Sequence, residues 1–202
     1  MHSDKIDTFW KWFAQNSERL KNAERDMRVG NELSDQLRHL HQPPGYTGTG
    51  PGLSFDLGPR REGRHEFIVS AGGIAPAFRL ARELVAHAPE IPGWRVSALI
   101  PPMNIETLLT ECEMKADDIW FQASPAGAKL NVTLYIRNLP PEKEHDILET
   151  KYFLLYALGE QAFATKISHF DCQILPSSPA ACGLKPFREL PDEISKLELA
   201  SK

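Results

Sequence analysis

One segment with residue types suited to chemistry is Ser70-Ala71-Gly72-Gly73, which follows a β-rich run and precedes a helical pattern. Glycines at a strand-to-helix turn let backbone N–H groups approach an anion at the start of the helix. The segment carries neither the Gly-Lys-Ser/Thr of a P-loop nor a GxGxxG followed by an acidic residue. Two interpretations stay open: a ligand-binding turn formed by Ser70, Gly72 and Gly73, or a turn that only reverses the chain.

The histidines, cysteines and acidic residues show no spacing typical of a metal site or a catalytic set. Zinc requires three or four convergent ligands, and His39 and His41 would point in different directions on a helix. His169 and Cys172 fall on opposite faces of one predicted strand, so they cannot form a dyad within it. We therefore predict no metal and no cofactor and assign no catalytic residue. The sequence leaves open whether the protein is an enzyme.

Composition limits the partners that this chain can be expected to bind. The 202 residues carry a net charge of −4, and nothing is basic enough to suggest nucleic-acid binding. No apolar run approaches the length of a membrane span, and the first residues do not resemble a secretory signal. Three widely spaced cysteines are typical of reduced thiols. We expect a cytoplasmic protein with a possible protein partner, and the oligomeric state is not predicted.

The elements that would position these residues begin with a helical N-terminal segment, 1–42. Its first apolar residues, Ile6, Phe9, Trp10 and Phe13, are spaced as on one face of a helix. A second helix is expected near residues 29–41, so the segment predicts a helical pair. The aromatic residues could form a partner surface, or they could dock the first helix onto a sheet.

The segment 43–52 is rich in proline and glycine, which predicts a loop. It could link the helical pair to the rest of the chain or serve as a lid over a site. Because about 40 helical residues rarely form a core alone, we predict a single domain over 1–202. Its sheet and remaining helices would lie in 53–202.

Beyond residue 53 the pattern predicts an α+β fold. Its main feature is a mixed, largely antiparallel sheet with helices packed on it. Two strand–helix–strand successions can each form a right-handed βαβ unit. They are 65–70, 76–88 and 95–99 in the first, and 129–136, 142–158 and 167–174 in the second. The residues that we expect in the core are Phe67, Val69, Trp94, Leu99, Phe121, Leu134, Leu154 and Leu158.

Several strings also resemble an uncharacterised family of bacterial cytosolic proteins. They are Phe9-Trp10-x-Trp12-Phe13, the run 66–73 ending in Ser-Ala-Gly-Gly, Ala88-Pro89-x-x-Pro92-Gly93-Trp94, the run 118–121, and Leu158-Gly159-Glu160. The resemblance would cover most of the chain. It implies a bacterial cytosolic origin and no particular chemistry.

Two hypotheses about function follow. The first is a non-catalytic binding or interaction protein, which the acidic balance and the aromatic-rich first helix favour. The second is a small hydrolase or transferase with an anion-binding turn at Ser70–Gly73.

Overall fold

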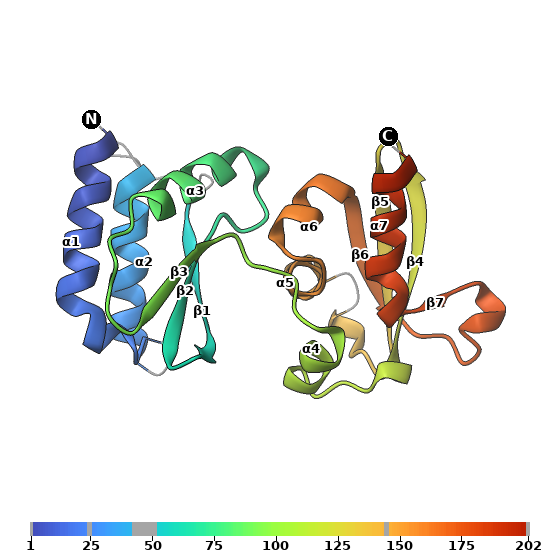
Figure 1. Cartoon of the computed structure of the whole chain (residues 1–202). Helices are drawn as coiled ribbons and strands as arrows, with labels where there is room; N and C mark the ends of the chain where they lie inside the picture. The colour runs from blue at the N-terminus through green and yellow to red at the C-terminus, as the bar shows by residue number, and fades with distance from the viewer. Residues whose placement is uncertain (1, 24–25, 42–51, 144–145, 201–202) are drawn as a thin grey trace. The chain divides into compact units, whose positions relative to one another are not determined.

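The computed structural model describes residues 2–23, 26–41, 52–143 and 146–200. The chain forms two compact units, residues 1–100 and 101–202, where the sequence predicts a single domain. The division falls between Ile100 and Pro101. The predicted loop at 43–52 lies, apart from Gly52, outside the described residues. Each unit has its own sheet (Figure 1) and is described by itself.

Unit 1 consists of a helical pair and a three-stranded sheet. Its elements are α1 (His2–Leu20), α2 (Met27–His41), β1 (Ser54–Arg61), β2 (Arg64–Ser70), the 3₁₀ turn η1 (Ala75–Ala77), α3 (Phe78–Ala86) and β3 (Trp94–Ala98). The strand order is β1-β2-β3, with β1 antiparallel and β3 parallel to β2. The predicted helical pair and the first predicted βαβ unit are therefore confirmed.

Aromatic residues of α1 form the core of unit 1 together with the central strand. The Phe13 ring lies 4.7 Å from the Phe67 ring and 5.2 Å from the Trp94 ring, centroid to centroid. The indole N–H of Trp10 donates to the Leu84 carbonyl at 2.8 Å, which ties α1 to α3. Phe9, Trp10 and Phe13 are buried, so the aromatic stripe docks α1 onto the sheet, one of the two uses the sequence left open.

The hairpin of unit 1 is longer than its sequence suggests. Glycine, proline and charge over 58–64 predict a turn, yet β1 continues to Arg61 and pairs there with Arg64. The turn itself is Glu62-Gly63, with φ of 50° and 79°, the two positive values that a tight type I′ hairpin requires. Pro59 is accommodated because β1 is an edge strand whose register shifts between Gly58 and Arg61.

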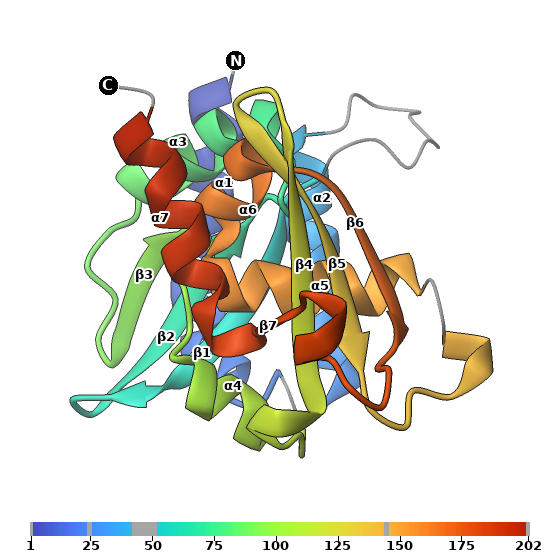
Figure 2. The ribbon, with the colours of Figure 1, turned by 90° about the vertical axis from the view of Figure 1, so that its right-hand side faces the viewer.

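Unit 2 contains a four-stranded sheet in the order β6-β5-β4-β7. Its elements are α4 (Ile105–Glu111), β4 (Ile119–Ala126), β5 (Lys129–Ile136), the 3₁₀ turn η3 (Pro141–Lys143), α5 (Ile147–Leu158), α6 (Glu160–Lys166), β6 (Ile167–Ile174), β7 (Lys185–Pro186) and α7 (Leu190–Ala200). The pair β5–β6 is parallel and the pairs β4–β5 and β4–β7 are antiparallel. The second predicted βαβ unit is therefore confirmed, and α5 runs across the strands in Figure 2.

Two helices, α5 and α6, separated by Gly159, connect the strands of this βαβ unit. We predicted one helix over 142–158, ended by glycine. The α-helix begins later, at Ile147, because the Asp146 side chain caps it by accepting the backbone N–H groups of Leu148 and Glu149. It ends at Leu158 as expected, and α6 follows after Gly159, which has φ 77° and ψ 150°.

The α+β fold class is confirmed, with one correction to the sheet. Among the described residues, the strands of 54–98 pair only with one another, and so do those of 119–186. The single mixed sheet is thus two smaller mixed sheets. All eight residues predicted for the core are buried. No helix in the described ranges is long and apolar enough to span a membrane.

Candidate functional site

The predicted anion-binding turn lies at the carboxyl end of β2, and its backbone donors are largely used within the turn. The Gly72 N–H donates to the Ser70 side-chain oxygen at 3.0 Å. The Ile74 N–H donates to the Ala71 carbonyl at 3.1 Å. Gly72 and Gly73 have φ of 60° and 74°, so glycine is required by the backbone conformation of the turn itself.

The helix that follows this turn offers few further donors. The chain passes through η1, which contains Pro76 and so lacks one N–H, and the Ala77 N–H donates to the Ile74 carbonyl. At the same edge, Leu99 follows β3 with a φ of 67°, and its N–H donates to the Val69 carbonyl at 2.8 Å. The carboxyl edge of the parallel pair is therefore held by its own hydrogen bonds.

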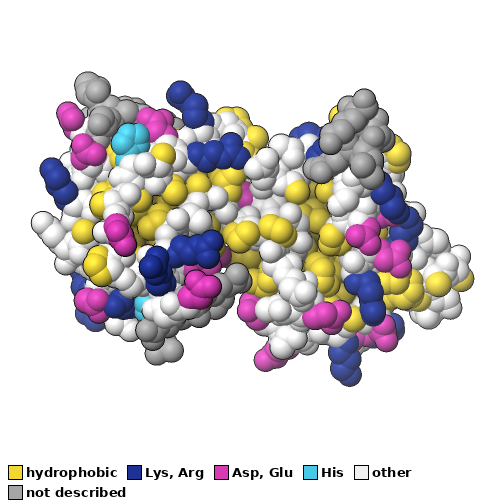
Figure 3. Space-filling model, viewed as in Figure 1, with side chains coloured by type: hydrophobic (Ala, Val, Ile, Leu, Met, Phe, Trp, Pro, Cys, Tyr) yellow, Lys and Arg dark blue, Asp and Glu magenta, His cyan; other side chains and the backbone are white. Residues whose placement is uncertain are grey.

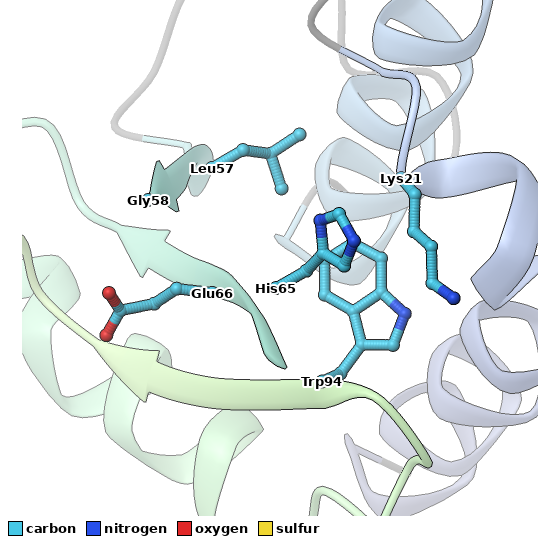
Figure 4. A pocket seen from close by; sticks show the side chains of 6 residues that line it. All are labelled: Lys21, Leu57, Gly58, His65, Glu66 and Trp94. Carbon is cyan, nitrogen blue, oxygen red and sulfur yellow. The ribbon is translucent and has the colours of Figure 1, made fainter. Parts of the chain in front are cut away.

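A small pocket lies at the opposite, amino edge of the same two strands. It has a volume of about 30 Å³ and is open to solvent on one side. The first residue of β3, Trp94, and its register partner on β2, His65, form one wall. The remaining lining residues are Lys21, Leu57, Gly58 and Glu66. Figure 4 shows Lys21, His65 and Trp94 together, while the Glu66 carboxylate is directed away from them.

Two contacts fix the aromatic wall of this pocket. The indole N–H of Trp94 donates to the Ser17 carbonyl at 3.2 Å, which anchors the ring beneath α1. The His65 ring lies 5.4 Å from the Trp94 ring at 40°. The Lys21 ammonium pairs at 2.6 Å with Glu18, whose side chain is 81% exposed. Trp94 and Glu66 are themselves buried, so the pocket is a shallow polar one beside the His65 imidazole and the Lys21 ammonium.

A second candidate is the exposed face of α5 in unit 2. Leu148 is 63% exposed and Tyr152 is 46% exposed. They lie one helical turn apart and so share a face. Between them Thr150 is buried, and Leu154 and Leu158 continue the buried face. The Lys151 ammonium lies 5.8 Å from the centre of the Tyr152 ring. Figure 3 shows hydrophobic side chains at the surface among charged ones.

Charged residues hold the amino end of α5. The Lys143 ammonium pairs with the carboxylates of Asp146 and Glu149, and these partners raise the pKa of Lys143. Hydrogen bonds from the backbone N–H of Glu149 and from Lys143 lower the pKa of Asp146. The first turn of the helix is thus both capped and bridged, so Leu148 is presented from an ordered helix start.

The cysteines do not form a catalytic arrangement with the histidine of the same strand. The thiol of Cys172 is buried and lies 3.3 Å from the Lys143 carbonyl, while His169 is exposed. Cys112 and Cys182 are exposed, although partial desolvation and then the nearby Glu111 carboxylate raise the pKa of the Cys112 thiol. Within the described ranges, no group of three or more His, Cys, Asp or Glu side chains is placed to hold a metal ion.

Sequence reasoning missed both the pocket and the α5 face. The pocket joins residues from four separate segments, and only the pairing of His65 with Trp94 could have indicated it. The α5 face had a visible signal, since Leu148 and Tyr152 are apolar residues outside the buried stripe of their helix. Whether Ser70, Gly72 and Gly73 bind a ligand stays a prediction. Comparison with known protein families, with curated proteins and with solved structures finds no match to this chain.

Proposed function

We propose that this chain is a non-catalytic interaction protein that binds another protein through the exposed face of α5. The observation that carries the proposal is the pairing of Leu148 and Tyr152 on one face, both large, apolar and substantially exposed. Exposed large apolar side chains that adjoin one another are typical of contact surfaces. Tyrosine in particular is enriched among the residues that dominate binding energy.

The geometry of α5 supports this role. Anchors spaced four residues apart on a helix suit insertion into an apolar groove of a partner. The helix is fixed from beneath by Thr150, Leu154 and Leu158, and its first turn is capped by Asp146. A helix held in this way loses little conformational entropy on binding.

The alternative, a hydrolase or transferase at the Ser70–Gly73 turn, has less support. Its mechanism would need free N–H donors at the turn, yet those of Gly72 and Ile74 already donate to Ser70 and Ala71. An anion would have to displace these bonds. We therefore favour the interaction protein.

The test compares capture by four versions of the full chain, immobilised and exposed to an extract of the source cells. Leu148→Ser and Tyr152→Ser remove the two anchors. Met27→Ser is the matched control, because Met27 is 79% exposed and stands in unit 1. A protein retained by the wild type and by Met27→Ser, and lost with both α5 variants, is the expected partner.

Purified partner must then bind the wild type in titration calorimetry. Each α5 substitution should weaken that binding by about tenfold or more, as loss of an anchor residue does. Identical capture by all four versions would contradict the proposal. If the retained protein is a second copy of this chain, the same variants should abolish the dimer in light scattering.

A further inference from the structure

The outer edge of β3 in unit 1 presents backbone groups that the sheet itself does not use. β3 has β2 as its one neighbour in the order β1-β2-β3, and Figure 1 shows no further strand of this sheet beyond it. In a parallel ladder, alternate residues direct their backbone groups toward the neighbouring strand. The bond from the Leu99 N–H to the Val69 carbonyl, at 2.8 Å, fixes the phase of this alternation. The N–H groups and carbonyls of Val96 and Ala98 therefore face away from β2.

These outward groups have no partner among the described residues, because no hydrogen bond engages the backbone of Val96 or Ala98 on this side. The Trp94 carbonyl faces the same way, while the Trp94 N–H donates to the Ile91 carbonyl at 3.1 Å. The edge therefore offers the N–H groups of residues 96 and 98 and the carbonyls of residues 94, 96 and 98.

The other edges of the two sheets are protected against pairing, as strand edges commonly are. β1 contains Pro59 and a register shift. On β6, the Cys172 N–H donates to the Asp171 side chain at 2.9 Å, which takes up a donor that faces away from β5. The remaining edge strand, β7, has two residues, and β4 beyond it contains Pro125. β3 has neither a proline nor a register irregularity, and its single charged residue is Arg95.

We propose that β3 pairs with β3 of a second copy of this chain, antiparallel and across a two-fold axis. A register centred on Val96 places Val96 opposite its counterpart and Trp94 opposite Ala98. Each Val96 N–H then donates to the carbonyl of the other Val96, and each Ala98 N–H donates to the opposite Trp94 carbonyl. This register matches every outward residue of the strand.

Charge and symmetry favour a second copy as the occupant. In this register Arg95 lies opposite Ser97, so the pairing avoids the contact of like charges that a register centred on Arg95 would create. The two-fold pairing uses the β3 edge of both copies and so closes at a dimer. The outer strands of the joined sheet are then the two copies of β1, whose Pro59 opposes the addition of a further strand.

Sedimentation equilibrium of the full chain tests the pairing. A contact confined to the five residues of β3 in each copy is smaller than a standard interface of roughly 1,200–2,000 Å², so a weak dimer is expected. The apparent mass should rise from that of the monomer toward that of the dimer between about 10 µM and 1 mM protein, the range in which weak contacts dissociate.

Three variants locate the contact. Ala98→Pro removes an outward N–H that the sheet of unit 1 does not use, and edge strands accept proline at such a position. Its dimer should be weaker by about tenfold or more, because two intermolecular hydrogen bonds are lost. Ala98→Val keeps the N–H and should dimerise as the wild type does. Leu148→Ser on α5 should also leave the dimer unchanged, which separates this contact from the surface of the proposed function.

Disulfide formation tests the register and does not depend on a proline variant. Single cysteines are introduced into a chain whose exposed thiols are removed by Cys112→Ser and Cys182→Ser. Val96→Cys puts two Cα atoms about 5.5 Å apart across the axis, within the range of a disulfide. Arg95→Cys is the matched control, since position 95 is more exposed but its two copies lie diagonally, about 7–8 Å apart. Val96→Cys should therefore cross-link faster under mild oxidation.

Four results would overturn the proposal. One is a monomer mass at all concentrations up to about 1 mM. Another is equal dimerisation of the wild type and a folded Ala98→Pro variant. The third is cross-linking of Arg95→Cys as fast as that of Val96→Cys, because random collisions would produce it. The fourth is a dimer that Leu148→Ser abolishes, which would assign the contact to α5 instead.

Discussion

Replacing Gly159 with alanine tests the packing of unit 2 at one backbone position. Gly159 lies between α5 and α6 with φ 77° and ψ 150°, a region of backbone conformation that is essentially restricted to glycine. A Cβ at this residue would lie 2.8 Å from both the backbone nitrogen and the Cδ of Pro102. Neither atom is the end of a flexible side chain, so the chain itself must move.

The expected cost has two parts. Holding a non-glycine residue in this conformation costs about 1–3 kcal/mol, and forcing atoms into a packed site costs about 1–3 kcal/mol. The lower entropy of the unfolded alanine chain returns about 0.4–1 kcal/mol. We therefore expect Gly159→Ala to lower the free energy of unfolding by about 3 kcal/mol.

The matched control is Gly127→Ala in the hairpin between β4 and β5. Gly127 also has a positive φ, 64°, but a Cβ there would meet nothing within 4 Å. Only the conformational part applies, about 1–2 kcal/mol before the entropic return. Most of the difference between the two variants is therefore expected from the contact with Pro102.

Urea unfolding followed by circular dichroism and by tryptophan fluorescence measures both variants. With a slope of about 2 kcal/mol/M, Gly159→Ala should move the midpoint down by about 1.5 M. The slopes must be compared as well, because a chain with two compact units need not unfold in one step. A midpoint for Gly159→Ala equal to that of Gly127→Ala would refute the reasoning.

Three further predictions concern unit 2. Leu154→Ala should lower the free energy of unfolding by about 2–5 kcal/mol because Leu154 is fully buried. Leu148→Ala on the exposed face should change it by about 0.5 kcal/mol or less. Equal urea midpoints for the two variants would show that the faces of α5 are assigned wrongly. The Asp146 carboxylate, with a lowered pKa in the folded chain, stabilises α5 above its ordinary unfolded pKa of about 3.9 and loses this effect as the pH falls through the folded value. Relative to Asp146→Asn, the wild type should thus lose stability only below about pH 4, and parallel profiles in acid titration would count against the cap. A thiol reagent should modify two cysteines of the native protein and reach Cys172 only after denaturation. Rapid modification of all three cysteines in the native protein would instead place the Cys172 thiol at the surface.

Local patterns predicted most of the elements, because each depends on neighbouring residues. The aromatic spacing in 6–13 predicts the buried face of α1, and glycine after Leu158 predicts the end of α5. The sequence of the short helix α4 does not distinguish a helix from a strand. The structure resolves it through Asn104, whose side chain accepts the N–H groups of Glu106 and Thr107.

Long-range pairing could not be predicted in the same way. The sequences of residues 94–98 and 119–126 do not indicate whether these strands pair with each other or with other strands, since both arrangements leave the same local alternation of side chains. The pocket could not be predicted from the sequence for the same reason. Lys21, Leu57 and Trp94 are far apart in the sequence, and only the register of β2 with β3 brings His65 to Trp94.

The topology of the two sheets shows why the strand-end rule for ligand sites, which favours the turn at Ser70–Gly73, does not apply to this fold. In open α/β sheets, ligands bind outside the carboxyl ends of strands where two crossovers leave in opposite directions and open a crevice. The sheet of unit 1 has one parallel crossover, from β2 to β3, and its other neighbour, β1, belongs to a hairpin. The sheet of unit 2 repeats this order, with the β4–β5 hairpin followed by one crossover to β6. Because neither sheet has crossovers on both sides of a strand, no such crevice is expected at Ser70, Gly72 and Gly73, and any ligand bound there must be held by the turn alone.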